Sequence, residues 1–259
     1  MMRVITCFCH CDPLSTEYMH SAAFINLQRF FNIYLNKFSN PEIIDFGGAS
    51  IAKKKTALDV LHKYENIDFK YKSVDINKGS NVDIVLANPY SFSEIKPESV
   101  DIVISTSTFE HVEFFWLSFL EILKILKPNG LFYMNAPSNG DFHRFEKDCW
   151  RYYPDSANAL VKWGKYNKFS PLLLENYTSK QLIEGGWNDY VAVFLKDEKF
   201  INNFKERIIY NYKDYFNGID HEGKLYNFSN KTEDHKNWGF KLWYKIRKKI
   251  DKKKIKIDF

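Results

Sequence analysis

Acidic residues and paired glycines follow short apolar runs in the first half of the chain. The segment 43–50 reads IIDFGGAS, so that Asp45, Gly47 and Gly48 come at the end of an apolar run. Glycines there let the backbone turn sharply and approach a ligand, although the pair alone also suits an ordinary tight turn. Asp75 ends the next apolar run, where a carboxylate can accept hydrogen bonds from both hydroxyls of a ribose. Together they predict a site for an adenosine-containing ligand.

The glycine spacing separates two classes of such ligands. A nicotinamide dinucleotide needs Gly-x-Gly-x-x-Gly, which holds its pyrophosphate at the N-terminus of a helix. The run 47–52 reads GGASIA and three lysines follow it, so the later glycines are missing. The pattern therefore disfavours a NAD-dependent nucleotide-sugar oxidoreductase, which stays as an alternative.

Alternating apolar and mixed segments must position these residues. We expect strands at 43–46, 69–76, 83–87, 100–105, 131–135, 172–176 and 190–195. We expect helices at 15–37, 57–64, 114–126, 200–216 and 238–254. Strands that alternate with helices predict a parallel sheet covered by helices, and ligands of such sheets bind beyond the carboxyl ends of the strands.

Three segments resemble class I S-adenosylmethionine-dependent methyltransferases. Residues 43–50 resemble the family's first motif, in which apolar residues precede Asp/Glu-x-Gly-x-Gly, with Ala49 in place of the last glycine. The segment 100–112, VDIVISTSTFEHV, looks like its fourth strand and Glu-His turn. The segment 120–134, LEILKILKPNGLFYM, is similar to the helix, turn and strand that follow. The resemblance covers about residues 41–137.

The resemblance implies an α/β, Rossmann-like, doubly wound, seven-stranded and mostly parallel sheet. An N-terminal strand and helix extension (1–40) would precede the S-adenosylmethionine-binding methyltransferase domain (41–198), which includes a substrate loop at 136–175. A C-terminal helical appendage with a basic tail (199–259) would follow.

The resemblance also implies the cofactor and its contacts. S-adenosyl-L-methionine would lie with its methionine moiety near the glycine turn, its ribose near Asp75 and its adenine near the end of the third strand. Asn88 would present its side-chain oxygen to the adenine amino group. The implied cofactor residues are Asp45, Phe46, Gly47, Gly48, Asp75, Ile76, Ala87, Asn88, Pro89, Tyr90, Ser105 and Thr106.

The segment 136–156, APSNGDFHRFEKDCWRYYPDS, resembles a bacterial branch of the family with an AP-S…HR…D-CWR-YPD pattern. That branch is associated with surface polysaccharide (capsule or lipopolysaccharide) biosynthesis. The resemblance implies an O-methyltransferase whose small-molecule substrate is a sugar, a sugar nucleotide, or a phosphate or phosphoramidate group that decorates a sugar.

Two histidines are candidates for the catalytic base, because imidazole can take up a hydroxyl proton near neutral pH. His143 is the first candidate, since it lies in the expected substrate loop. His111 is the second, with Glu110 to orient its ring, although the pair could equally shape the loop by a structural hydrogen bond.

The same loop supplies the candidate substrate-binding residues. Two arginines could grip a phosphate bidentately, or form ion pairs with acids of the loop. Aromatic side chains could stack on a sugar or a base, or belong to the core. The candidates are Arg144, Asp148, Trp150, Arg151 and Tyr152.

Positive charge is concentrated at the end of the chain. Of the net charge of +5, residues 241–259 contribute +7 from nine Lys or Arg and two Asp, which leaves −2 for residues 1–240. A nucleic-acid partner is therefore not expected, because it would need positive charge spread over a binding face. The segment FKLWYKIRKKI (240–250) resembles a helix for a membrane surface, and a solvated helix end is the favoured alternative.

Cysteine spacing and hydropathy argue against several other classes of protein. Residues 7–11, CFCHC, lack the C-x-x-C spacing of a zinc site, so neither a metal site nor a disulfide framework is expected. The N-terminus is a poor signal peptide, and no run of about 18 apolar residues occurs. We expect a cytoplasmic protein, with peripheral contact at the inner membrane face if the tail binds lipid. A non-catalytic relative that binds a partner through the aromatic loop and tail is the other alternative.

Overall fold

Nine strands hydrogen-bond into a single sheet in the computed structural model, which describes residues 21–49, 56–182, 187–231 and 233. Their order is β3-β2-β1-β4-β5-β7-β6-β8-β9. Strands β1 to β5 pair in parallel, whereas β7 runs antiparallel between β5 and β6, and β8 and β9 add antiparallel pairs. The predicted mostly parallel α/β sheet is confirmed, but it has nine strands instead of the predicted seven.

The strands follow the apolar runs of the sequence. Their bounds are β1 Glu42–Phe46, β2 Lys70–Asp75, β3 Ile84–Val85, β4 Val100–Thr106, β5 Leu126–Pro137, β6 Leu172–Ser179, β7 Asp189–Leu195, β8 Tyr215–Asp220 and β9 Leu225–Tyr226. The chain order reverses between β1 and β4, which is where ligands bind on doubly wound sheets.

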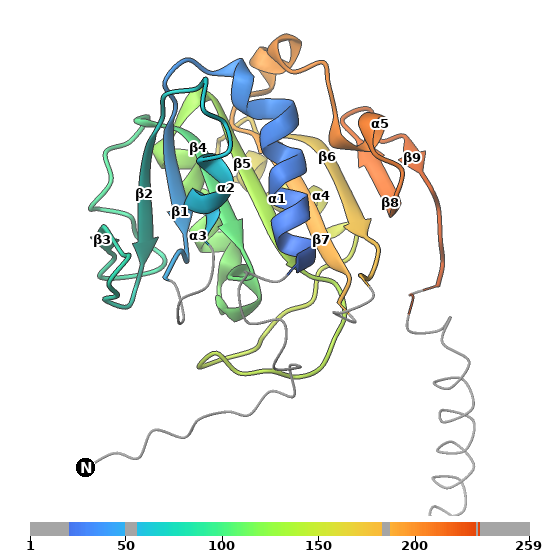
Figure 1. Cartoon of the computed structure of the whole chain (residues 1–259), viewed down its shortest axis with the longest axis horizontal. Helices are drawn as coiled ribbons and strands as arrows, with labels where there is room; N and C mark the ends of the chain where they lie inside the picture. The colour runs from blue at the N-terminus through green and yellow to red at the C-terminus, as the bar shows by residue number, and fades with distance from the viewer. Residues whose placement is uncertain (1–20, 50–55, 183–186, 232, 234–259) are drawn as a thin grey trace, which may run out of the picture.

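Helices cover both faces of the sheet (Figure 1). The α-helices are α1 Ser21–Tyr34, α2 Ala57–Leu61, α3 Phe115–Ile125, α4 Ser156–Tyr166 and α5 Ile208–Asn211, and short 3-10 helices lie at Leu35–Lys37, Phe109–His111 and Glu198–Asn203. Helices α1 and α2 cover one face, whereas α3 and α4 cover the other. The parallel strands point to the lower edge of the sheet in Figure 1, below which a loop joins β5 to α4.

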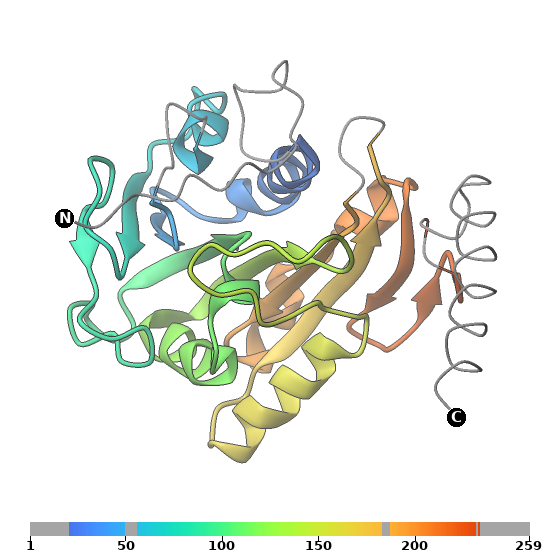
Figure 2. The same ribbon diagram turned by 90° about the horizontal axis from the view of Figure 1, so that it is seen from below.

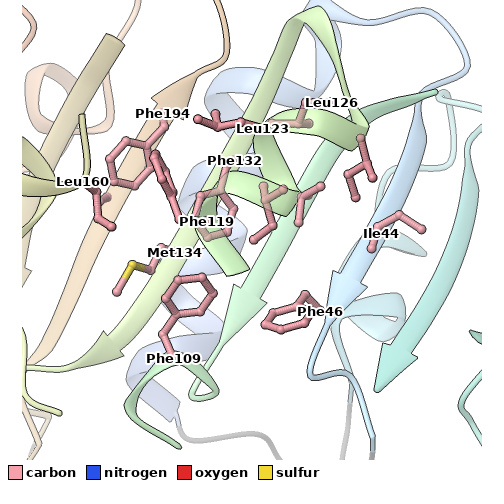
Figure 3. Close-up of a cluster of buried hydrophobic side chains, with 14 of the residues drawn as sticks. Ile44, Phe46, Phe109, Phe119, Leu123, Leu126, Phe132, Met134, Leu160 and Phe194 are labelled. Atoms are coloured by element: carbon pink, nitrogen blue, oxygen red, sulfur yellow. The ribbon is translucent and has the colours of Figure 1, made fainter. Parts of the chain in front are cut away.

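The strand period of two divides the core into two layers. In β4, Ile102 and Ile104 pack on the side of α1, whereas Val103 packs on the side of α3. Figure 3 shows the second layer, in which rings such as Phe132, Phe119 and Phe194 lie together. Strand β4 is buried on both faces, and this explains its continuous apolar sequence.

Helix α1 is amphipathic and packs its apolar side on the sheet. Its buried residues recur at helical spacing and include Leu27, Phe30, Phe31 and Tyr34. The helix was expected to begin at residue 15, and residues 15–20 lie outside the described part of the chain. A 3-10 turn completes the expected span to Lys37.

The helix predicted at 200–216 is wrong. Only Ile208–Asn211 is α-helical there, and β8 begins at Tyr215. The buried Arg207 explains the break: its side chain donates to the main-chain oxygens of Leu174, Phe204 and Glu206, and its backbone is extended. Within the segment 199–226, strands β8 and β9 therefore extend the sheet, where a helical appendage was expected.

The predicted loop at 136–175 also contains an unpredicted helix. Helix α4 buries Ala157, Leu160 and Gly164, so the irregular loop runs only from residue 138 to 155. The mixture of charged and aromatic residues concealed this helix, because its buried side is narrow.

The Lys-Pro-Asn-Gly turn interrupts β5 as an insertion in the ladder. Leu126 pairs with Val100 and Leu131 with Ile102, so the four residues 127–130 lie opposite the single residue Asp101, and three residues are extra on the β5 side. The expected strand at 131–135 is thereby confirmed and lengthened to Pro137.

Three expectations fall on residues outside the described ranges. They are the C-x-C-x-C segment at 7–11, the helix at 238–254 and the basic tail at 241–259. Within the described ranges, no helix combines the length and apolar character that a membrane crossing needs.

Candidate functional site

The glycine turn after β1 leaves no room for side chains. Gly47 has a φ of +78°, which favours glycine, and a Cβ on it would lie 2.2 Å from the Thr108 side chain. A Cβ on Gly48 would lie 2.6 Å from Ser73 Oγ. The turn is held by its two amides, which donate to the Val74 oxygen at 2.8 and 3.3 Å. The required glycines thus form the bare backbone turn expected from the sequence.

Asp45 lies beneath this turn and is already engaged. Its carboxylate is 5% exposed and accepts a hydrogen bond of 2.6 Å from the Tyr71 hydroxyl. Burial raises the pKa of Asp45 to about 6, against the lowering effect of the Tyr71 hydrogen bond. Its neighbour Phe46 is buried too, with its ring 5.2 Å from that of Phe92. Both residues support the turn from within the domain.

Asp75 stands at the carboxyl end of β2, beside the glycine turn. It is half-buried, and its carboxylate accepts from the amide of Asn77 at 2.8 Å and from that of Ala49 at 3.4 Å. The following Ile76 is 45% exposed. An acid next to an exposed apolar side chain suits a ribose with an adjoining base.

The turn after β3 is held by the acid Glu94, whereas the sequence suggested a role there for the amide of Asn88. The Asn88 side-chain oxygen accepts the amide of Tyr90 at 2.8 Å, within its own turn. The carboxylate of Glu94 accepts the amide of Ala87 at 2.9 Å, and backbone hydrogen bonds hold its pKa below the usual range. The Pro89 oxygen accepts from Ser118 Oγ at 2.7 Å.

Two hydroxyl groups at the end of β4 are buried and unpaired. Ser105 Oγ and Thr106 Oγ1 have no hydrogen-bond partner among the residues that the structure describes. A buried hydroxyl without a partner costs free energy unless a ligand satisfies it. A polar cofactor could form hydrogen bonds with these two unpaired hydroxyls and lie against the backbone of the glycine turn. The residues present therefore fit S-adenosylmethionine.

A second polar group forms where the chain after β4 meets the loop after β5. Figure 2 looks onto this end of the sheet, where the yellow-green loop 138–155 crosses. Glu110 and His111 come from the 3-10 helix after β4, and His143 comes from the loop. The two imidazole rings are 5.2 Å apart, edge to face. The fold therefore brings all three predicted catalytic residues together.

Glu110 is the most strongly perturbed acid of this group. Its side chain is 1% exposed, and its Oε1 lies 3.6 Å from Nε2 of His111. Burial, together with a smaller effect of the nearby Asp189, raises the pKa of Glu110 to about 8. Burial also lowers the pKa of His111, partly offset by a hydrogen bond to the Lys147 oxygen.

Asp148 and Arg151 form the framework of the loop. The guanidinium donates to both carboxylate oxygens, at 2.6 and 2.8 Å, and also to the Asp141 oxygen. Asp148 in turn accepts the amide of His143 at 2.8 Å. The ion-pair alternative for Arg151 is therefore what the structure has. Trp187, which sequence reasoning missed, covers the assembly with its ring 5.1 Å from that of His143.

The other three predicted substrate residues lie in different surroundings. Tyr152 is 2% exposed and its hydroxyl donates to the Phe109 oxygen, so its ring belongs to the core, a correction to its expected place at the substrate. Trp150 packs on the core against Phe115 and donates to main-chain oxygens of the neighbouring turn. Arg144 is exposed, 5.5 Å from the ring of Phe142.

Three residues at the glycine turn and the adjoining turn after β3 were not found from the sequence. Tyr71 binds Asp45, Asn81 donates to the Gly48 oxygen at 2.7 Å, and Glu94 holds the adjoining turn. They lie outside the segments that resemble the family's motifs. Of the three, only Glu94 could have been found from the sequence, because it is an acid that closely follows the expected third strand.

Residues 45–134 match the family described as the methyltransferase domain. No curated protein matches the chain.

Several solved structures are similar over two thirds of the chain. The 1,6-didemethyltoxoflavin-N1-methyltransferase of Burkholderia thailandensis, solved with S-adenosylhomocysteine, is 13% identical at a TM-score of 0.48, covering 68% of this chain and 79% of that one. A SAM-dependent methyltransferase of Aquifex aeolicus is 12% identical at 0.45, covering 66% and 89%. A Pyrococcus horikoshii OT3 protein is 15% identical at 0.46, covering 68% and 91%.

Proposed function

From the methyltransferase domain at residues 45–134, whose cofactor is S-adenosyl-L-methionine, we propose that this chain is an O-methyltransferase for a sugar-derived small molecule. One observation carries the proposal. The cofactor-side residues of the domain and the group Glu110, His111 and His143 lie at the carboxyl ends of the same parallel strands, where an acceptor would meet the cofactor.

The cofactor side is proposed to bind as the family resemblance implies. The bound cofactor supplies an electrophilic methyl group on a sulfonium. Because Gly47 and Gly48 have no side chains, the methionine moiety can lie close to their backbone. Asp75 accepts hydrogen bonds from the ribose hydroxyls, and Ile76 lies beside the ribose. The unpaired hydroxyls of Ser105 and Thr106 form hydrogen bonds with polar atoms of the ligand. The segment 87–90 borders the adenine.

The acceptor side is proposed to bind along the loop 138–155. A sugar hydroxyl is a weak nucleophile, so removal of its proton helps the transfer. His143 lies on the loop and is partly exposed, whereas His111 and Glu110 lie behind it. Arg144 is exposed and can meet a phosphate of a nucleotide-linked substrate, and Arg151 orients the loop through Asp148.

The substrate class comes from the loop pattern. Its likeness to the branch associated with surface polysaccharide biosynthesis supports a sugar, a sugar nucleotide or a phosphate-type group on a sugar as acceptor. We place the reaction in the cytoplasm, with the basic segment 241–259 as a candidate contact for the inner membrane face.

Calorimetric titration with S-adenosylhomocysteine and with NAD tests the cofactor. We expect S-adenosylhomocysteine to bind and NAD not to bind. Asp75→Ala removes the acid at the ribose and should weaken binding at least about tenfold, as expected for loss of a charged hydrogen bond. The matched control is Asp68→Ala, an exposed acid of the preceding loop. Binding of NAD alone would favour the oxidoreductase alternative.

A methyl-transfer assay over candidate acceptors tests the reaction. Free sugars, nucleotide sugars and sugar phosphates are offered with methyl-labelled cofactor, and transfer to a hydroxyl oxygen is expected for one class. If the cofactor binds and no class accepts a methyl group, the non-catalytic alternative gains.

A further inference from the structure

Glu110, His111 and His143 offer three ligand atoms to a common point. One carboxylate oxygen and one nitrogen from each ring lie within 4.8 Å of one another. Two imidazoles and a carboxylate are a donor set that first-row transition metals prefer, and they leave further coordination positions open. The residues come from two chain segments, so only the tertiary structure assembles the set.

The rest of each imidazole is oriented as in a metal ligand. Nδ1 of His111 faces the main-chain oxygen of Lys147, and Nδ1 of His143 faces the oxygen of Asp141 at 3.2 Å. A ring nitrogen that donates to a carbonyl leaves Nε2 with its lone pair for a metal. For His111, that Nε2 is the atom 3.6 Å from the carboxylate of Glu110.

The carboxylate of Glu110 is an independent sign of a missing cation. Its side chain is 1% exposed, and Oε2 has no hydrogen-bond partner within the described ranges. A buried carboxylate oxygen without a donor is costly, and a bound cation removes that cost.

We propose that Glu110, His111 and His143 form a binding site for one divalent first-row transition metal ion, such as Mn²⁺, Co²⁺ or Zn²⁺. Mg²⁺ and Ca²⁺ are disfavoured because they prefer oxygen ligands.

The charges around the cluster suit a cation. Asp148 neutralises Arg151 through two hydrogen bonds, and Arg151 Nη2 lies 3.4 Å from Nδ1 of His143. Asp189 is close enough to act on the carboxyl group of Glu110. The carboxyl groups of Asp148, Asp189 and Glu110 itself thus lie near the guanidinium of Arg151, and this balance favours a divalent ion.

The role of the ion rests on the proposed function. Bound there, it would join the loop 138–155 to the turn after β4 and offer an open position to an acceptor oxygen, whose pKa a metal lowers. The lone pairs of both histidines would then be used for the ion, so neither would act as the base.

Cobalt titration followed by visible absorption tests the site in the full chain. All four cysteines are first changed to serine, because thiolates would compete for the ion. We expect one Co²⁺ per chain with ligand-field bands from nitrogen and oxygen ligands. Glu110→Gln and His143→Asn should each weaken binding at least about tenfold. His221→Asn is the matched control, because it removes a histidine 3.9 Å from another glutamate.

The outcomes separate this inference from the proposed function. Absence of stoichiometric binding, or binding that Glu110→Gln and His143→Asn leave unchanged, overturns the metal site. Titration of the same variants with S-adenosylhomocysteine should give unaltered affinity, which shows that they are folded. Loss of cofactor binding in the parent protein with cobalt binding intact would instead contradict the proposed function alone.

Discussion

Burial sets different tasks for the acidic residues at the strand ends. Asp45 and Glu110 are nearly inaccessible, and burial raises the pKa of both. Asp148 has two hydrogen bonds from Arg151, which hold its pKa below the usual range despite burial. A buried acid without a neighbouring cation readily takes up a proton or binds a cationic ligand. An acid that is paired with an arginine stays charged and holds the surrounding chain in place.

Replacement of Asp45 should change the pH dependence of stability. The pKa of Asp45 is about 6 in the folded chain, against an ordinary value of 3.8 for an aspartate in water, so the folded state disfavours its charged form. Its stability contribution therefore falls as pH rises from about 4 to 6, by up to about 3 kcal/mol. Asp45→Asn should gain relative stability over that interval, as measured by urea unfolding without cofactor. A difference independent of pH would contradict this.

Gly47→Ala should cost more than the same change at another glycine of similar conformation. Gly223 has a φ of +80° and nothing within 4 Å of a built Cβ, whereas at Gly47 that Cβ meets the Thr108 side chain. Gly223→Ala therefore measures backbone strain alone, about 1 kcal/mol. Gly47→Ala adds the clash, and urea unfolding of the two variants compares them. Equal losses would show that Thr108 moves aside freely.

At the scale of elements, a buried carboxylate links three of them. Glu175 of β6 accepts from the Tyr34 hydroxyl at the end of α1 and from the amides of Ile208 and Ile209 at the start of α5. Amides at a helix start lack partners within the helix, so this side chain serves as their cap.

Glu175→Ala should destabilise the chain by at least about 3 kcal/mol, because it leaves three buried donors without an acceptor. Tyr34→Phe removes one of the three bonds and should cost about 1 kcal/mol. Thermal and urea unfolding measure both variants. If Glu175→Ala cost no more than Tyr34→Phe, the proposed cap would be unimportant.

At the scale of the whole molecule, the segment 199–226 belongs to the described core. Ile208, Ile209 and Tyr215 are at most 2% exposed and pack in the layer that contains α1. Strand β8 pairs with β6. A division of the chain at residue 198 would expose that layer and the edge of β6.

A chain that ends at residue 198 should therefore lose cooperative unfolding. Ile209→Ala in the full chain is the milder comparison, with an expected loss of about 2–4 kcal/mol and an intact transition. Circular dichroism during heating distinguishes the two. A truncated chain that melts sharply at the parent temperature would show that 199–259 is a separate appendage.

The positions of strands β1 and β2 and of the glycine turn followed from local patterns. Apolar runs that end in Asp45 and Asp75, with the two glycines between them, predicted β1, β2 and the turn. Each pattern depends on the strand period and on backbone sterics, both of which act between neighbours in sequence. The prediction of a helix at 200–216 was wrong because Arg207 is buried and donates to the main-chain oxygen of Leu174, which is far away in the sequence. Such a long-range contact overrides the local helix propensity.

The sequence by itself determined which residue types end the strands, because turn chemistry and the apolar period are local. Only the tertiary structure decided which side chains lose contact with water and which distant ones meet. Glu175 and Tyr34 are 141 residues apart, and His143 approaches Glu110 and His111 through the loop after β5. Burial and long-range pairing depend on how the packed layers enclose a group. For this reason the sequence named Glu110, His111 and His143 as candidates, whereas their mutual distances and the burial of Glu110 came only from the tertiary structure.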